Sequence, residues 1–287
     1  MLRAPLSAAR GRVQAPIFRL PVRRQSSFRP MSSYVAEFSA SIRAIPTPVK
    51  ALIGANVLVF VAYAAYADSN PALRRFFKQH MTLSRPNMHR GRYDSIFGSM
   101  FMHTGIVHMG FNLFTLHSFG PIAVAYLGAA PFLGLYAGAG AVGAIAQLAY
   151  AGWAPSAGLP ASPWVRRDAE YVGASGAICG VLGYVFTRVP QLPVNVRRSG
   201  ERGLEEDADA AVMGRGTSRP LPLLLLLLLL LQVFFIPATA AVLGPVGMAI
   251  SLYCLWAPGP QGVGHADHLG GFLTGVAVAL VHARARR

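Results

Sequence analysis

Long uncharged segments dominate the hydrophobic and polar pattern of this chain. Asp, Glu, Lys and Arg are missing from residues 51–67, 95–165, 171–187, 220–266 and 268–283. A helix needs about 20 mostly apolar residues, and no fewer than about 17, to cross the hydrocarbon core of a bilayer. Residues 95–165 can therefore hold two crossings with a loop between them. The pattern predicts an all-α polytopic membrane protein, organised as a bundle of six transmembrane helices.

Five of the six spans can be placed directly from this pattern. They cover about 51–67, 96–118, 129–150, 173–189 and 266–283. The remaining crossing lies in a region with two apolar stretches, 221–236, which contains ten leucines, and 238–257. If the spans on either side of this region begin at the same membrane face, only an odd number of crossings can separate them. Residues 238–257 have the better length for that crossing, and 221–236 remain the alternative.

Composition supports the membrane class, because 53% of the residues are hydrophobic and only 13% are charged, against roughly 25% charged in soluble domains. The net charge of +15 does not indicate a nucleic-acid partner, since much of it lies in an N-terminal arm with seven arginines before the first acid, Glu37. An Arg-rich, Ser-containing and acid-free arm is typical of a mitochondrial presequence, and a basic tail on another membrane is the alternative.

These features predict two regions and an orientation. We expect residues 1–45 to be presequence and disordered arm and residues 46–287 to be the membrane domain, with a flexible polar loop at 188–219. With both termini inside, 18 of the 26 Lys and Arg fall on the inner side, as the positive-inside rule favours. In a mitochondrial inner membrane, the segment that begins near residue 173 would then open toward the intermembrane space.

Two polar residues stand near the start of otherwise apolar segments. Ser175 follows Gly173 and Ala174 in one segment, and His268 opens another. Polar groups in spans are costly, so a functional role is the default interpretation. A serine hydroxyl needs a base to become a nucleophile, and a neutral imidazole can take its proton and return it to a leaving amine. The pair predicts a catalytic dyad. A triad is not expected, because the side chain of Asp267 would point about 100° away from that of His268 on a helix.

The glycines beside these two residues favour their meeting. Gly176 and Gly180 form a small-xxx-small face after Ser175, and Gly271 and Gly275 form another after His268. Such faces let helix backbones approach closely in membranes. Ser175 could instead be a small packing residue, and His268 a buried polar contact.

A further polar motif lies in the second expected span. His108 and Asn112 are spaced i, i+4 and share a helix face, where both could donate hydrogen bonds to a developing oxyanion. Interhelical hydrogen bonding is the alternative, and His103 looks structural. The histidines could also suggest a metal, but His265-Ala-Asp-His268 lacks the zinc-protease pattern of two histidines flanking a glutamate. We expect no metal and no other cofactor.

In their order along the chain, His108 with Asn112, Gly173-Ala-Ser175-Gly176, and His268-Leu-Gly-Gly271 resemble the signature of rhomboid intramembrane serine proteases. The resemblance covers roughly residues 50–283. Cys179, at a position where bacterial members often have tyrosine, and Asp267 before His268 are more similar to the mitochondrial presenilin-associated rhomboid-like branch.

The resemblance implies a six-helix rhomboid bundle that cleaves single-span membrane proteins within the lipid bilayer. Ser175 would be the nucleophile and His268 the general base, while His108, Asn112 and the Ser175 amide would form the oxyanion hole. Two alternatives remain: a catalytically inactive rhomboid-like protein that binds membrane clients, and a channel or transporter. The latter predicts polar residues repeated across several spans, which this chain lacks. The sequence does not indicate an oligomeric state.

Overall fold

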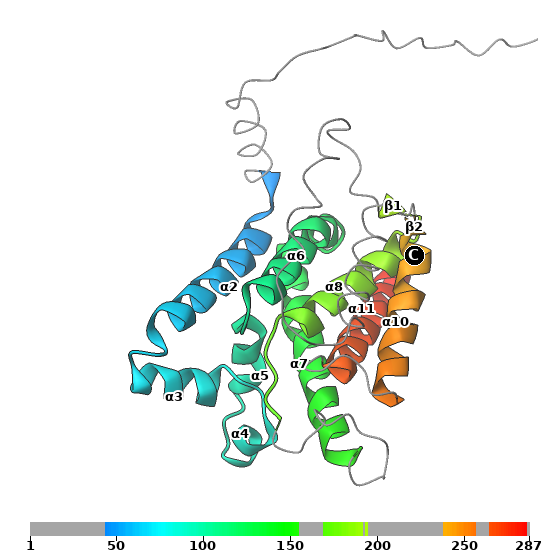
Figure 1. Cartoon of the computed structure of the whole chain (residues 1–287). Helices are drawn as coiled ribbons and strands as arrows, with labels where there is room; N and C mark the ends of the chain where they lie inside the picture. Colours follow the sequence, from blue (N-terminus) through cyan, green and yellow to red (C-terminus); the bar gives the residue numbers. More distant parts are fainter. Residues whose placement is uncertain (1–43, 155–168, 192, 195–237, 257–263, 286–287) are drawn as a thin grey trace, which may run out of the picture. The chain divides into compact units, whose positions relative to one another are not determined.

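The described part of the chain consists mainly of α-helices joined by loops (Figure 1). The structure is a computed structural model that describes residues 44–154, 169–191, 193–194, 238–256 and 264–285. The longer helices are α2 (Thr47–Tyr66), α6 (Ile106–Leu127), α7 (Ala129–Trp153), α8 (Ser175–Arg188), α10 (Ala240–Trp256) and α11 (His265–Ala285). The shorter ones are α3 (Pro71–His80), α4 (Arg85–His89), α5 (Ser95–Gly98) and the 3-10 helix η1 (Ser99–Phe101). Two short strands, β1 (Pro193–Val194) and β2 (Ala238–Thr239), pair antiparallel.

The helices lie at the expected positions except at the second span, and α8, with 14 residues, is shorter than the about 17 residues that a crossing needs. Among the described residues, α2, α7 and α11 are long and apolar enough to cross a membrane. The apolar pattern predicts a second span from residue 96, but the long helix α6 begins only at Ile106. Residues 95–101 form α5 and η1 instead, and Gly105 has the extended conformation of an N-cap. The start of α6 therefore coincides with a change in backbone conformation at Gly105, which apolar composition does not indicate.

Helix α10 covers most of 238–257, the stretch preferred for the fifth span. The alternative stretch, 221–236, lies outside the described residues, as do residues 1–43 of the N-terminal arm and most of the polar loop at 188–219.

Helix α8 lies at the centre of the bundle and packs against α6, α7, α10 and α11. Its side chains Val181, Tyr184 and Val185 are completely buried. They join Leu116 of α6 and Phe132 of α7 in the main hydrophobic cluster. The predicted all-α membrane fold is confirmed.

The loop between α2 and α6 lies at the same end of the bundle as the beginnings of α8 and α11 (the lower end in Figure 1). Backbone hydrogen bonds join this loop to the segment before α8, between Leu83 and Tyr171 and between Ser99 and Gly173. α3 runs across the direction of α2 within this loop (Figure 1). The polar motifs of α8 and α11 therefore open at the end that carries the first loop.

Candidate active site

The chain reaches α8 through a short extended segment that is held by the first loop. Tyr171 pairs with Leu83 through two backbone hydrogen bonds of 2.9 Å, and the Gly173 N–H donates to the Ser99 carbonyl at 2.9 Å. Gly173 has a φ of +131°, a conformation that residues with side chains rarely adopt. Ser175 is the first residue of α8, and its side chain is half-buried. Its hydroxyl thus lies at a helix N-terminus whose approach is fixed by backbone pairing.

His108 lies against the same glycine. A methyl group at Gly173 would be 2.7 Å from His108 Cε1, 3.0 Å from His108 Nε2 and 3.8 Å from Ser175 Oγ. The imidazole and the hydroxyl therefore both approach the same space beside Gly173. An alanine at this position would displace the imidazole as well as strain the backbone.

The Asn112 side chain is buried, whereas His108 is exposed. Asn112 Nδ2 lies 3.1 Å from Nε2 of the fully buried His103, and it also donates to the His108 carbonyl at 3.0 Å. The rings of His103 and His108 meet edge to face, with centroids 5.0 Å apart. His103, which sequence reasoning considered structural, holds the Asn112 amide in place.

His268 lies on the face of α11 that packs against α8. It precedes Gly271 by three residues, and residues at this spacing share a helix face. A methyl group at Gly271 would overlap the Gly176 carbonyl oxygen, and one at Gly275 would overlap the Gly180 carbonyl oxygen. The two backbones are thus in direct contact, and both helices run in the same direction.

The structure brings the first turns of these two helices together, but it does not join the two side chains. Among the hydrogen bonds of the described residues, none connects the Ser175 hydroxyl to the His268 imidazole. The His268 ring instead meets the His265 ring edge to face, with centroids 6.2 Å apart.

Asp267 binds the beginning of α8. A methyl group at Gly176 of α8 or Gly143 of α7 would overlap the Asp267 carboxylate, which accepts a hydrogen bond from the Gly176 N–H. Ala174, the N-cap residue of α8, provides no side-chain cap of its own. A carboxylate at a helix N-terminus satisfies an unpaired amide and complements the helix dipole. Asp267 therefore caps α8 from a neighbouring helix, which leaves His268 without a carboxylate partner from this residue.

Gln147 binds the beginning of α11 in a similar way. This residue of α7 is buried, and its Oε1 accepts hydrogen bonds from the Ala266 and Asp267 amides at 3.1 and 3.3 Å. Both helices that carry proposed catalytic residues thus receive a cap from a helix packed against them. Sequence reasoning missed Gln147 as a site residue, although a polar amide in the uncharged segment 95–165 was an available signal.

A serine hydroxyl, two imidazoles and a helix N-terminus at one end of an apolar bundle fit acyl-transfer chemistry. Residues 90–285 match the family model described as the rhomboid domain. The chain belongs to the rhomboid family. The resemblance seen in the sequence is thereby confirmed, and helices α6, α7, α8, α10 and α11 lie within the matched residues.

Several rhomboid proteins are similar to this one. Rhomboid protein 1, mitochondrial, of Saccharomyces cerevisiae is 35% identical over 141 residues, which are 48% of this chain and 36% of the yeast protein. The human presenilin-associated rhomboid-like protein, mitochondrial, is 31% identical over 143 residues, 50% of this chain and 33% of its own length. Presenilin-associated rhomboid-like protein A, mitochondrial, of Danio rerio is 26% identical over 164 residues, which are 57% of this chain and 38% of the Danio rerio protein. The matched part of the chain spans about a third of the length of these relatives.

Proposed function

We propose that this rhomboid protein is an intramembrane serine endopeptidase, a hydrolase that cleaves single-span membrane proteins. One observation carries the proposal: His108 and the Ser175 hydroxyl both approach the space beside Gly173, while close glycine packing holds the helix of His268 against that of Ser175. This arrangement offers a nucleophile, a base and an oxyanion donor at one end of α8.

In the proposed reaction, Ser175 Oγ attacks the scissile carbonyl carbon while His268 takes the hydroxyl proton. His108 and the Ser175 amide donate hydrogen bonds to the oxyanion, and His268 then protonates the leaving amine. Because Asp267 is bonded to the Gly176 amide, the catalytic unit is a dyad. We expect the His268 imidazole to hydrogen-bond to the Ser175 hydroxyl when substrate binds.

The substrate must present an extended backbone, so its helix has to unwind locally near the scissile bond. Segments with Gly, Pro or other weak helix formers unwind at the lowest cost, and we propose them as the substrate class. In a six-span arrangement, substrate would reach the dyad laterally beside α10, while water arrives from the end that carries the first loop.

The direct test is proteolysis by purified protein in liposomes, with a single-span substrate whose transmembrane segment is rich in glycine. Wild type is compared with Ser175→Ala and His268→Ala. We expect cleavage by wild type only, while both variants keep the wild-type thermal unfolding midpoint. Cleavage that survives Ser175→Ala would refute the dyad. A wild type that cleaves none of several such substrates would favour the client-binding alternative.

We further propose that the protein lies in the mitochondrial inner membrane, with the dyad opening toward the intermembrane space. The Arg-rich arm before Glu37 and the mitochondrial relatives support this location. A fluorescent reporter fused to residues 1–45 should accumulate in mitochondria. A cytosolic or secretory signal from this fusion would contradict the location without affecting the proposed chemistry.

A further inference from the structure

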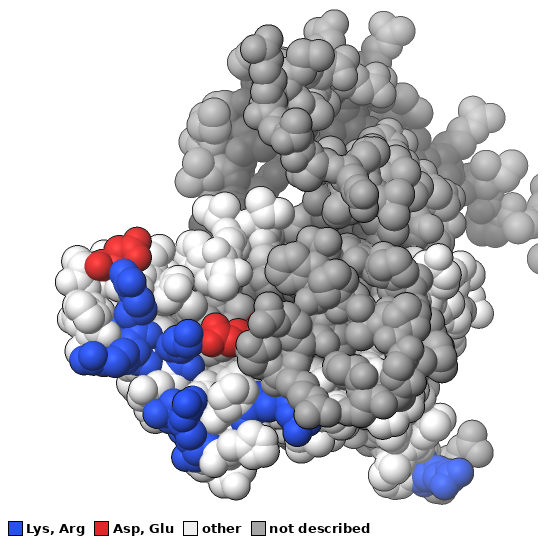
Figure 2. Space-filling model, turned by 60° about the horizontal axis from the view of Figure 1, so that its bottom comes forward, with Lys and Arg blue, Asp and Glu red and all other residues white. Residues whose placement is uncertain are grey.

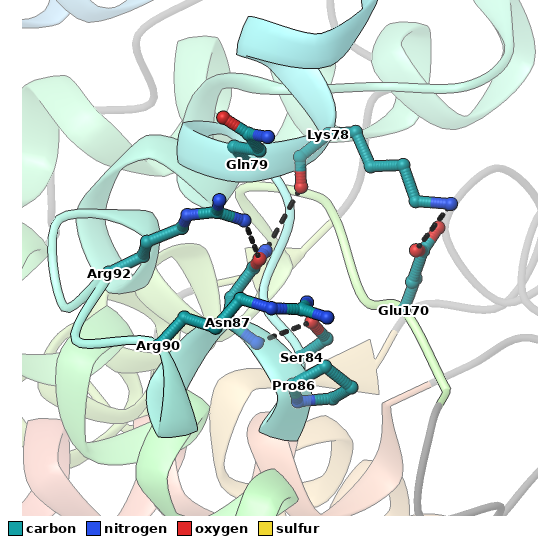
Figure 3. Close-up of a pocket in the computed structure, with 8 residues that line it drawn as sticks. All are labelled: Lys78, Gln79, Ser84, Pro86, Asn87, Arg90, Arg92 and Glu170. Carbon is teal, nitrogen blue, oxygen red and sulfur yellow. Dashed lines mark hydrogen bonds and ion pairs between the residues drawn. The ribbon is translucent and has the colours of Figure 1, made fainter.

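A polar pocket lies between α3, α4 and the segment that leads to Ser175 (Figure 3). Its volume is about 620 Å³, within the roughly 300–1,000 Å³ of ligand-binding clefts. Three cations line it, Lys78, Arg90 and Arg92, together with one acid, Glu170. The pocket therefore has a positive balance in the part of the structure that is described.

Most hydrogen-bond donors of these cations are unused within the described residues. Lys78 Nζ is 3.3 Å from Glu170 Oε1, but both side chains are exposed, and exposed ion pairs are weak. Arg92 uses one Nη1 bond of 3.1 Å, to Asn87 Oδ1, out of five N–H donors on a guanidinium. The Arg90 side chain forms no hydrogen bond or ion pair with the described part of the chain. Two guanidinium groups and an ammonium can thus turn toward a common anion.

The acids of the first loop do not neutralise this pocket. Asp68 binds Arg74 at 2.9 Å, and Asp94 binds His80 at 2.6 Å, in both cases through residues that do not line the pocket. Lys and Arg gather on the side of the molecule that carries this loop (left in Figure 2). Planar guanidinium forks bind phosphate oxygens in pairs, which makes phosphate the best-matched anion.

The surroundings of the pocket favour a lipid over a soluble phosphate. α2, an apolar helix of spanning length, ends at Tyr66, and α3 runs across it only a few residues later (Figure 1). Phe76, Tyr93 and Phe97, which belong to the same loop as these cations, are 50%, 65% and 51% exposed. Aromatic and basic side chains together are typical of the headgroup level of a membrane. A phospholipid phosphate lies at that depth.

We propose that this pocket binds the phosphate of an anionic phospholipid headgroup, held by Arg90 and Arg92 with Lys78 turning from Glu170 to the lipid. Glu170 is adjacent to Tyr171, whose backbone pairs with Leu83. A bound headgroup would therefore tie α3 and the loop after α4 to the segment that leads to Ser175. The site does not depend on the proposed proteolysis.

The test measures lipid binding by the full chain in neutral detergent, by native mass spectrometry during titration with phosphatidic acid. We expect one tightly bound molecule, with affinity at least about tenfold above that for phosphatidylcholine. Arg90→Gln/Arg92→Gln should weaken binding by about tenfold or more, because charge-assisted hydrogen bonds are lost. Arg74→Gln/Arg75→Gln, which removes the same charge from α3 outside the pocket, should change it by less than about twofold.

Three results would overturn the proposal. Equal weakening by the two double variants would mean diffuse attraction to the basic loop. Equally tight binding of phosphatidylcholine would mean that the net charge of the headgroup is not recognised. Inorganic phosphate that displaces the lipid at matched concentration would assign the pocket to a soluble anion. If the double variant loses its wild-type thermal unfolding midpoint, Arg90→Gln alone decides, since the Arg90 side chain has no partner among the described residues.

Discussion

At the scale of single residues, the two proposed oxyanion donors have different environments. The His108 ring lies against Gly173 with the Ser175 hydroxyl nearby. The Asn112 amide is already bonded to His103 and to the His108 carbonyl. Donating to an oxyanion would require Asn112 to give up one of these bonds, whereas His108 needs no such exchange.

We therefore expect unequal losses from the two alanine variants. His108→Ala should lower kcat by about 10²–10³, the usual cost of an oxyanion donor, with little change in KM. Asn112→Ala should lower kcat by less, about tenfold, because α6 loses the hydrogen bond between Asn112 and His103. Both constants can be measured with a single-span substrate in liposomes. An Asn112→Ala loss equal to or larger than that of His108→Ala would contradict this assignment.

Gln147 provides a second prediction at this scale. Gln147→Ala leaves the Ala266 and Asp267 amides without their acceptor, and a buried unsatisfied amide costs about 1–3 kcal/mol. The thermal unfolding midpoint in detergent should therefore fall.

The exposed Gln191 offers a matched control. Gln191→Ala removes the same amide group, and we expect no change in the unfolding midpoint. If Gln147→Ala also left the midpoint unchanged, the cap on α11 would have no energetic role.

At the scale of elements, the contact between α8 and α11 depends on glycines, which have no side chain. The carbonyl oxygens of Gly176 and Gly180 occupy the places where Cβ atoms of Gly271 and Gly275 would lie. Backbones this close gain dispersion contacts that larger residues would prevent. The relative position of the two proposed catalytic residues follows from this contact.

Gly275→Ala tests the contact directly. The added methyl group would overlap the Gly180 carbonyl and approach the Tyr184 amide nitrogen to 2.7 Å. Forcing a methyl group into a packed interface costs about 1–3 kcal/mol, and a shift of α11 should lower kcat as well. Gly138→Ala on α7 is the control, because nothing lies within 4 Å of its new methyl group.

The control should be neutral or stabilising by about 0.5–1 kcal/mol, since alanine favours a helix over glycine. Thermal unfolding and proteolysis of both variants give the comparison. Equal stability of Gly275→Ala and Gly138→Ala would show that α8 and α11 do not need this close approach.

At the scale of the whole molecule, the described membrane domain has two chemically different ends. One end carries the basic first loop and the beginnings of α8 and α11 (Figure 1). Arg284 is exposed near the end of α11, at the opposite end of that helix. If α11 spans the membrane, Arg90 and Arg284 must lie on opposite sides.

Cysteine labelling measures this directly in mitoplasts, where only the intermembrane-space face is accessible. In a Cys179→Ala/Cys254→Ala background, Arg90→Cys should react with an impermeant maleimide and Arg284→Cys should not. Detergent should make both variants reactive, which controls for accessibility. Labelling of Arg284→Cys alone would show that the protein has the opposite orientation in the membrane. Labelling of both variants would contradict a membrane-spanning α11.

The sequence by itself determined the membrane class, the family and most helix positions. These depend on contiguous residues, because a long uncharged run has few alternatives to a helix in lipid. It also identified Ser175, His268, His108 and Asn112 as candidates, and their chemical roles remain predictions.

Only the tertiary structure decided how these residues are supported. Gln147 and Ala266 are 119 residues apart in the chain, and no local pattern links them. Asp267 meets Gly176 because two glycine faces allow three helices to converge. The start of α6 depends on the extended backbone at Gly105. The pocket on the first loop includes Glu170, which is far along the chain from Arg90. Contacts between distant residues are set by packing, which hydrophobic patterning constrains only in part.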